Sequence, residues 1–506
     1  MAGKDVVKEL SSTLSQARIL LAGDVDSSLL KEIDINTIVT RLIELHKNDL
    51  GISVASRDEI ISIIGDLSSE KTPVPVEIVR KSGFNPTAAE IDAEYRIFNK
   101  ERLTAEGNIN DFIDYFKSRL EKVRRIISER RSGGSFSANI EVTKSYTSGR
   151  EVTIVGMVSS KITTKKGNIM VVVEDETSDL KVIFMNGSSQ QSRALFESSK
   201  NLINDEVVAI KGKLSNQFLM ANAIVWPDIP IKEVKRTHDD IGIAFMSDIH
   251  VGSRQFLEKN FSKMLKWLNG EAQSANATLA GKIKYIIMAG DVADGVGIYP
   301  DHERELAIPD IYLQYKLLFN FIETIPDYIH VFVMPGNHDA VGRAEPQPPI
   351  GEELFKDFKR DNVHMVTNPS FMTLHGIDVL SYHGTSLDSM IRALPDTSYS
   401  APEKAMVELL KRRHLSPIYG GNVVVPSKED QLVIDKVPDI LHMGHIHKNG
   451  LAEYHGVKIV NSGTWQGSTA LQVRSGHMPT PCILPVYEGK QGTFTSVNFD
   501  GAEAWK

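Results

Sequence analysis

The sequence predicts a multidomain α+β protein in which a small helical module and a β-barrel precede a larger α/β domain. The chain has 506 residues, which is more than one hydrophobic core usually serves. The apolar pattern changes along the chain, from helical spacing to short strand-like runs and then to strands that alternate with helices. We therefore expect four segments, at residues 1–65, 66–137, 138–232 and 233–506.

The composition excludes several classes of protein. Hydrophobic residues make up 41% and charged residues 24% of the chain, as in ordinary globular proteins. The formal net charge is -8, so a nucleic-acid role requires local basic patches or a basic partner. The single cysteine, Cys482, excludes an internal disulfide and a thiolate zinc cluster. Because no apolar run suits a signal peptide or a membrane span, we expect a soluble cytoplasmic protein without membrane contact.

The first two segments, residues 1–65 and 66–137, carry no catalytic motif and are predicted to have supporting roles. Residues 1–65 place apolar side chains such as Leu10, Leu14 and Leu42 at helical spacing, which predicts a helical module for local folding or partner docking. Residues 66–137 begin as a proline-containing linker or extended strap and end in a basic amphipathic helix. The basic face of that helix either is solvated or contacts a phosphate backbone.

The third segment, residues 138–232, has the element order of an oligonucleotide-binding (OB) fold barrel: three strands, a helix and two more strands. Aromatic residues are few on these strands, mainly Phe184 and Phe218, so base stacking on the barrel is not well supported. A module that packs against the next domain is an equal alternative. The expected elements lie at residues 152–158, 168–175, 180–184, 193–202, 206–212 and 218–225.

Five short motifs in the last segment each follow an apolar, strand-like run. The carboxyl ends of neighbouring strands usually meet at one rim, so we expect their polar side chains to converge. Aspartate, asparagine and histidine suit Mn, Fe or Zn, and two such ions can hold a phosphoryl group and activate water. The sequence therefore predicts a two-metal phosphoesterase centre. The motifs are Asp248-Ile249-His250, Gly290-Asp291-Val292-Ala293-Asp294, Gly336-Asn337-His338-Asp339, Tyr382-His383-Gly384 and Gly444-His445-Ile446-His447.

Taken in order, the motifs resemble those of the calcineurin-like metallophosphoesterase family. The resemblance implies an α/β sandwich that binds two divalent ions, Mn²⁺ first, with Fe, Zn or Mg as alternatives. It also implies that His338 stabilises the transition state or protonates the leaving oxygen, and that Asp339 orients His338. The implied ligands are Asp248, His250, Asp291 and His447 for the first ion, and Asn337, His383 and His445 for the second, with Asp291 bridging both.

The sequence leaves two interpretations open for each of three features of the last segment. Asp294 either forms a turn or supports a ligand. His375 also precedes a glycine and rivals His383, although it lacks the apolar run that leads into His383. Residues 343–349, directly after the Asn-His-Asp motif, form either a substrate-guiding loop or an ordinary proline-rich surface loop.

The whole layout resembles the small subunits of archaeal family-D DNA polymerases, with the B-subunit architecture. The sequence segments that carry this resemblance lie at residues 245–253, 334–339 and 443–447. The resemblance implies a proofreading 3′→5′ exonuclease that acts on single-stranded or mismatched 3′ ends of DNA. It further implies a heterodimer with a large catalytic polymerase subunit. A stand-alone metallophosphodiesterase and a mainly structural polymerase subunit with weak activity are the rival interpretations.

Overall fold

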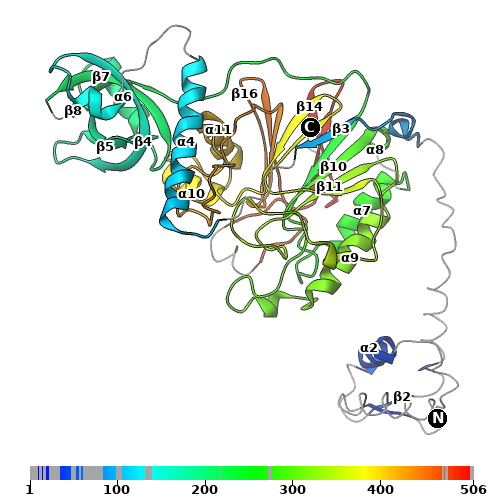
Figure 1. Ribbon diagram of the computed structural model, residues 1–506. Helices are drawn as coiled ribbons and strands as arrows, with labels where there is room; N and C mark the ends of the chain where they lie inside the picture. The colour runs from blue at the N-terminus through cyan, green and yellow to red at the C-terminus, as the bar shows by residue number, and fades with distance from the viewer. Residues whose placement is uncertain are drawn as a thin grey trace. The chain divides into compact units, whose positions relative to one another are not determined.

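The computed structural model describes residues 84–98, 105–130, 139–216, 218–271, 276–469, 472 and 477–501, with short pieces of the first 60 residues. The chain divides into two compact units, Met1–Val79 and Arg80–Lys506. Figure 1 gives the labels of the helices and strands. None of the helices in the described part of the chain is both long and apolar enough to cross a membrane.

The described residues of the first unit include a twelve-residue helix and a pair of short strands. Helix α2 (Ile35–His46) buries Ile38 and Leu42, which lie one turn apart on the same face. Strands β1 (Ile19–Leu21) and β2 (Ser53–Ala55) pair in parallel. The sequence predicted helices alone here, because three-residue strands are too short to show an alternating pattern.

The predicted barrel is confirmed as a closed five-stranded barrel with the strand order β4-β5-β6-β8-β7. Alternate residues of each strand point inward, and side chains such as Ile154, Val171, Val182 and Ile210 fill the interior. The elements are β4 (Glu151–Thr163), β5 (Ile169–Glu174), β6 (Asp179–Phe184), α6 (Gln190–Lys200), β7 (Val207–Ser215) and β8 (Phe218–Val225).

Two six-stranded sheets form the mixed α/β region that follows. The first has the order β12-β11-β10-β9-β18-β19 and the second β16-β17-β15-β14-β13-β3. The strands of the first sheet are β9 (Gly242–Met246), β10 (Ile283–Ala289), β11 (His330–Met334), β12 (Val363–Met365), β18 (Ile483–Glu488) and β19 (Thr493–Asn498). Those of the second are β3 (Tyr95–Phe98), β13 (Ser370–Leu374), β14 (Ile377–Ser381), β15 (Ile440–Met443), β16 (Asn449–Tyr454) and β17 (Val457–Ser462).

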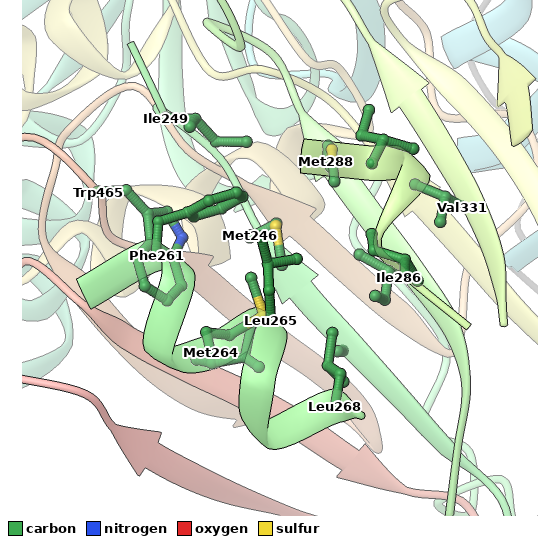
Figure 2. Close-up of a cluster of buried hydrophobic side chains, with 14 of the residues drawn as sticks. Met246, Ile249, Phe261, Met264, Leu265, Leu268, Ile286, Met288, Val331 and Trp465 are labelled. Atoms are coloured by element: carbon green, nitrogen blue, oxygen red, sulfur yellow. The ribbon is translucent and has the colours of Figure 1, made fainter. Parts of the chain in front are cut away.

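The sheets face each other and carry helices on their outer faces. Phe245 and Ile287 of the first sheet share a core with Val379 of the second. Helices α7 (Glu258–Leu268), α8 (Ala277–Lys282) and α9 (Ile311–Glu323) cover the first sheet, and α10 (Leu387–Ala393) and α11 (Pro402–Arg412) cover the second. Figure 2 shows Phe261, Met264, Leu265 and Leu268 of α7 packed against Met246, Ile286 and Met288 of the strands.

Residues 84–98 differ from the linker predicted for residues 66–137. Strand β3 pairs antiparallel with β13 and closes one edge of the second sheet. Ile97 reaches the core between the sheets, and Lys284 donates a hydrogen bond to the carbonyl of Ala88 at 3.1 Å. The other side chains of β3 are exposed, and a strand of only four residues is too short to show an alternating pattern in the sequence.

Helix α4 (Ile109–Arg130) joins the barrel to the α/β region (Figure 1). Its apolar face packs on Val155, Met157 and Val207 of the barrel. Arg119 is 2% exposed, and its Nε lies 2.7 Å from Asp430 Oδ2, which is 0% exposed. Further pairs along the helix are Lys122–Glu429, Arg124–Glu176 and Arg130–Asp228. The basic face is therefore neutralised by carboxylates of the same chain, which neither sequence alternative anticipated.

A second buried ion pair links the barrel to the α/β region. Nε of Arg412 on α11 lies 2.8 Å from Glu206 Oε2, and both side chains are 1% exposed. Trp226 Nε1 donates to the same carboxylate at 3.1 Å. Burial raises the pKa of Glu206, while Arg412 acts in the opposite direction. The barrel thus packs directly against the α/β region.

Replacing Arg119 tests how much the α4 ion pair stabilises this arrangement. Arg119→Ala removes the guanidinium beside the buried carboxylate of Asp430 and leaves His414 and Tyr115 as side-chain partners. Removing one partner of a buried ion pair typically costs about 3–5 kcal/mol. We expect a drop of that size in the free energy of unfolding, measured by chemical denaturation. Arg125→Ala on the same helix, where the side chain is 60% exposed, should change it by less than about 0.5 kcal/mol. Equal losses in the free energy of unfolding for the two variants would contradict a stabilising role of the Arg119–Asp430 pair.

Candidate metal centre

All seven predicted ligands lie in loops that directly follow strands β9, β10, β11, β14 and β15. Backbone hydrogen bonds tie these loops together. The amide of Asp248 donates to the carbonyl of Gly290 at 2.9 Å, and the amide of Gly444 donates to the carbonyl of His383 at 2.9 Å. The loops of both sheets therefore meet at one rim, and the ligands come together there.

Five of these ligands have a left-handed backbone. Positive φ brings a β-carbon close to the backbone and costs roughly 1–2 kcal/mol for each such residue. Strain of this kind persists only where the surrounding contacts enforce it, and it gathers at functional sites. The φ angles are 52° at Asp248, 53° at His250, 49° at Asp291, 67° at His445 and 56° at His447.

One group of donor atoms consists of Asp248, His250 and His447. The Nε2 atoms of the two histidines are 3.1 Å apart, and Nε2 of His447 lies 3.2 Å from Oδ1 of Asp248. Oδ1 of Asp248 is buried and accepts no hydrogen bond from the described residues. A buried carboxylate oxygen without a proton donor is well suited to a cation.

A second group consists of Asp291, His383 and His445. Nε2 of His383 lies 3.3 Å from Oδ2 of Asp291 and 3.0 Å from Oδ1 of Asn337. Oδ2 of Asp291 is also 3.9 Å from Nε2 of His250, which belongs to the first group. Asp291 therefore lies between the two groups.

Three of the ligand histidines each have one ring nitrogen beside an acceptor of the protein. When that nitrogen donates its proton, the other nitrogen presents a lone pair, which is how a neutral imidazole binds a metal ion. The residues present thus fit two divalent ions with nitrogen and oxygen ligands. The contacts are His250 Nδ1 to Asp294 Oδ1 at 2.8 Å, His383 Nδ1 to the Ala289 carbonyl at 2.8 Å and His445 Nε2 to Asp388 Oδ2 at 3.2 Å.

The electrostatics of the site also favour cations. Burial raises the pKa of the Asp291 carboxyl, but His383 and His338 outweigh burial and hold that pKa well below its usual range. Burial lowers the pKa of His250, yet its bond to Asp294 and the other aspartates raise the pKa to about 9. Buried carboxylates of this kind require positive charge nearby, which divalent ions supply.

His338 lies outside the groups around Asp248 and Asp291, and its ring forms a third cluster with His250 and Asp294. Its Nδ1 is 2.7 Å from the carbonyl oxygen of Asp294 and donates to it, which leaves Nε2 free to face a substrate. The ring meets that of His250 edge-on, with the centroids 4.8 Å apart. Burial lowers the pKa of His338 to about 4. The side chain remains 16% exposed, so it is accessible from the rim.

The structure differs from the predicted role of Asp339. Its carboxylate accepts the amide protons of Val292, Ala293 and Gly336 and the hydroxyl proton of Tyr315, and it does not contact the His338 ring. Asp339 follows His338 directly, and its side chain turns into the core to satisfy the loop amides. Burial raises the pKa of Asp339 to about 6. The carbonyl of Asp294 positions His338 instead.

Two residues support the predicted ligands. The sequence left the role of Asp294 open and gave no indication of Asp388. Asp294 binds His250 with one carboxylate oxygen and His302 with the other, at 2.8 and 3.3 Å, so the supporting role is the one observed. Asp388, on α10, was not predicted at all. The Asp-Ser-Met stretch that contains it carries no metal signature, and its role depends on α10 packing beside His445.

The structure also places His375 and residues 343–349. His375 precedes β14 whereas His383 follows it, so the two lie at opposite ends of the strand, and His375 binds the hydroxyl of Tyr285 at 2.6 Å. Within residues 343–349, Gln347 is buried and donates to the carbonyl of Gly336 at 3.1 Å. This part of the loop supports the ligand loop from behind.

The comparisons with known proteins agree with this architecture. Residues 243–449, which hold all seven predicted ligands, match the family model for the B subunits of DNA polymerases alpha and epsilon. The DNA polymerase II small subunit of Archaeoglobus fulgidus is 42% identical over 391 residues, which are 76% of each chain. That of Methanocaldococcus jannaschii is 38% identical over 79% of this chain and 68% of its own. The chain belongs to the family of archaeal DNA polymerase II small subunits.

Gly336 offers a test of the ligand geometry. A β-carbon at this position would lie 2.2 Å from Oδ1 of Asp291 and 2.9 Å from Cε1 of His383. Gly336→Ala should therefore displace both ligands and weaken Mn²⁺ binding by about tenfold or more, measured by calorimetry. Gly342→Ala is the matched control, because nothing lies within 4 Å of its β-carbon. Unchanged Mn²⁺ affinity in a folded Gly336→Ala protein would count against the site.

Proposed function

We propose that this chain is the 3′→5′ exonuclease subunit of a replicative DNA polymerase and hydrolyses phosphodiester bonds at a two-metal centre of the calcineurin-like phosphoesterase type. The observation that carries the proposal is the pair of donor groups with Asp291 between them. A purely structural subunit would have no need to keep strained ligands and buried carboxylates at one rim.

The donor set assigns the ions to residues. Asp248, His250 and His447 would hold one ion, Asn337, His383 and His445 the other, and Asp291 both. We favour Mn²⁺, with Fe, Zn or Mg as alternatives, because the ligands are imidazole nitrogens and amide or carboxylate oxygens. When bound, the ions would neutralise the phosphoryl charge and activate the attacking water.

The chain's own residues complete the reaction. His338 would face the scissile phosphodiester with Nε2. Because the negative charge of a bound phosphodiester favours the protonated ring, Nε2 would carry a proton there, stabilise the developing charge and deliver that proton to the departing 3′-oxygen of the preceding nucleotide. The Asp294 carbonyl fixes the direction of that nitrogen. Gln347 and Asn368 hold the ligand loop from behind, since Asn368 Oδ1 accepts the amide proton of His383 at 3.0 Å.

The proposed partner and substrate follow from the name of the relatives, DNA polymerase II small subunit. A small subunit implies a large catalytic polymerase subunit as partner, and DNA with a single-stranded or mismatched 3′ end as substrate. With a net charge of -8, the chain would share its grip on DNA with that partner. We assign the five-stranded barrel to the OB type because of its strand order and its helix between β6 and β7. We give it a packing role because Arg412 and α4 bind it to the α/β region.

His338→Ala tests the proposed chemistry. Removal of a proton-transfer group typically lowers the rate by about 100- to 10,000-fold. We expect stepwise loss of nucleotides from the 3′ end of single-stranded DNA with Mn²⁺ to fall by that factor, while the metal content stays unchanged because His338 is not a ligand. The readout is gel electrophoresis of 3′- and 5′-labelled strands, with metal analysis in parallel.

His238→Ala is the control, since that side chain is fully exposed and should leave the rate unchanged. Undiminished digestion by His338→Ala would refute the assigned role. Absence of digestion by the wild-type chain, both alone and with its large subunit, would instead favour the structural subunit.

A further inference from the structure

An exposed aromatic side chain lies beside the His445 side of the centre. Tyr399 is 38% exposed, and its ring meets that of His477 edge-on, with the centroids 5.5 Å apart. His477 is hydrogen-bonded through Nε2 to the carbonyl of Ile446, the residue between ligands His445 and His447. The aromatic pair is therefore fixed to the loop that carries two ligands.

A second link runs through Asp388. The hydroxyl of Tyr399 is hydrogen-bonded to the Asp388 carboxylate, whose Oδ2 lies 3.2 Å from Nε2 of His445. Arg392 is exposed on α10, and its Nε donates to the carbonyl of Asp388 at 3.0 Å. An aromatic ring and a guanidinium are thus both held by Asp388, which in turn contacts the predicted ligand His445.

This combination matches the chemistry of single-stranded DNA. Aromatic faces stack on bases with little sequence preference, and guanidinium groups bind backbone phosphates. We propose that Tyr399 and Arg392 bind the strand whose end lies in the centre, Tyr399 by stacking on a base and Arg392 by contacting a phosphate. This inference rests on the exonuclease function proposed above, because it assumes a DNA strand as substrate.

The opposite rim is less suited to the same task. Tyr299 lies near His338, but its ring packs on His302 with the centroids 4.4 Å apart, and its hydroxyl donates to Glu305 at 3.1 Å. Glu305 also adds a negative charge beside Tyr299, which repels a phosphate backbone. The Tyr399 side offers a more exposed ring and a cation instead.

The test compares two substrates with the full-length chain and Mn²⁺. One is a single-stranded oligothymidylate, and the other is bis(p-nitrophenyl) phosphate, a small phosphodiester without bases. Tyr399→Ala should raise KM for the oligonucleotide about tenfold, which is the loss expected for one base stack. The kcat for the oligonucleotide and the turnover of the small diester should not change. Tyr399→Phe keeps the ring and should behave as wild type.

Tyr312→Ala is the matched control, because Tyr312 is 59% exposed on α9 and away from the ligands. An unchanged KM in Tyr399→Ala would overturn the inference while the exonuclease function stands. A loss of small-diester turnover in both Tyr399 variants would also overturn it, since it would assign the residue to support of His445. If the wild-type chain hydrolyses neither substrate, both alone and with its large subunit, the exonuclease proposal fails. Fluorescence anisotropy of a labelled oligothymidylate with the same variants then decides the binding role, which an unchanged affinity in Tyr399→Ala would overturn.

Discussion

Two buried carboxylates, those of Asp248 and Asp291, set the main constraint on this structure. Both side chains are almost wholly inaccessible, and ionised groups are costly to bury unless positive charge or hydrogen-bond donors surround them. The neighbouring loops supply both. The amide of His445 donates to Asp248 at 2.9 Å, and the amide of His338 donates to Asp291 at 2.8 Å. The histidine rings complete the surroundings.

The same constraint explains the glycines and the strained ligands. Gly336 and Gly444 let the backbone approach the carboxylates so closely that a β-carbon would lie 2.2 Å from Asp291 Oδ1 and 2.4 Å from Asp248 Oδ2. Left-handed backbone at five of these residues turns the chain sharply just after the strands end, where the side chains come together. The double-sheet core holds this geometry in place, because the strands behind each loop are buried on both faces.

The sequence predicted much of this and missed what depends on distant contacts. The barrel and the order of the strands with their following ligands were readable, because apolar runs end in polar motifs. Strand β3 was read as part of a linker or extended strap because it has only four residues and its pairing partner, β13, lies more than 270 positions further along the chain. The basic helix was read as solvated or DNA-binding, because a sequence does not show that Asp430, 311 positions beyond Arg119, is its partner. Asp339 was assigned to its neighbour, whereas the chain turns its carboxylate to the loop amides.

The central claim is that the five loops build two adjacent cation sites with Asp291 between them. Anomalous scattering at the manganese edge, from crystals of the full chain grown with Mn²⁺, tests it most directly. The account predicts two peaks, one among Asp248, His250 and His447 and the other among Asn337, His383 and His445, each next to a carboxylate oxygen of Asp291. A single peak, or manganese bound elsewhere while these side chains keep their mutual hydrogen bonds, would contradict it.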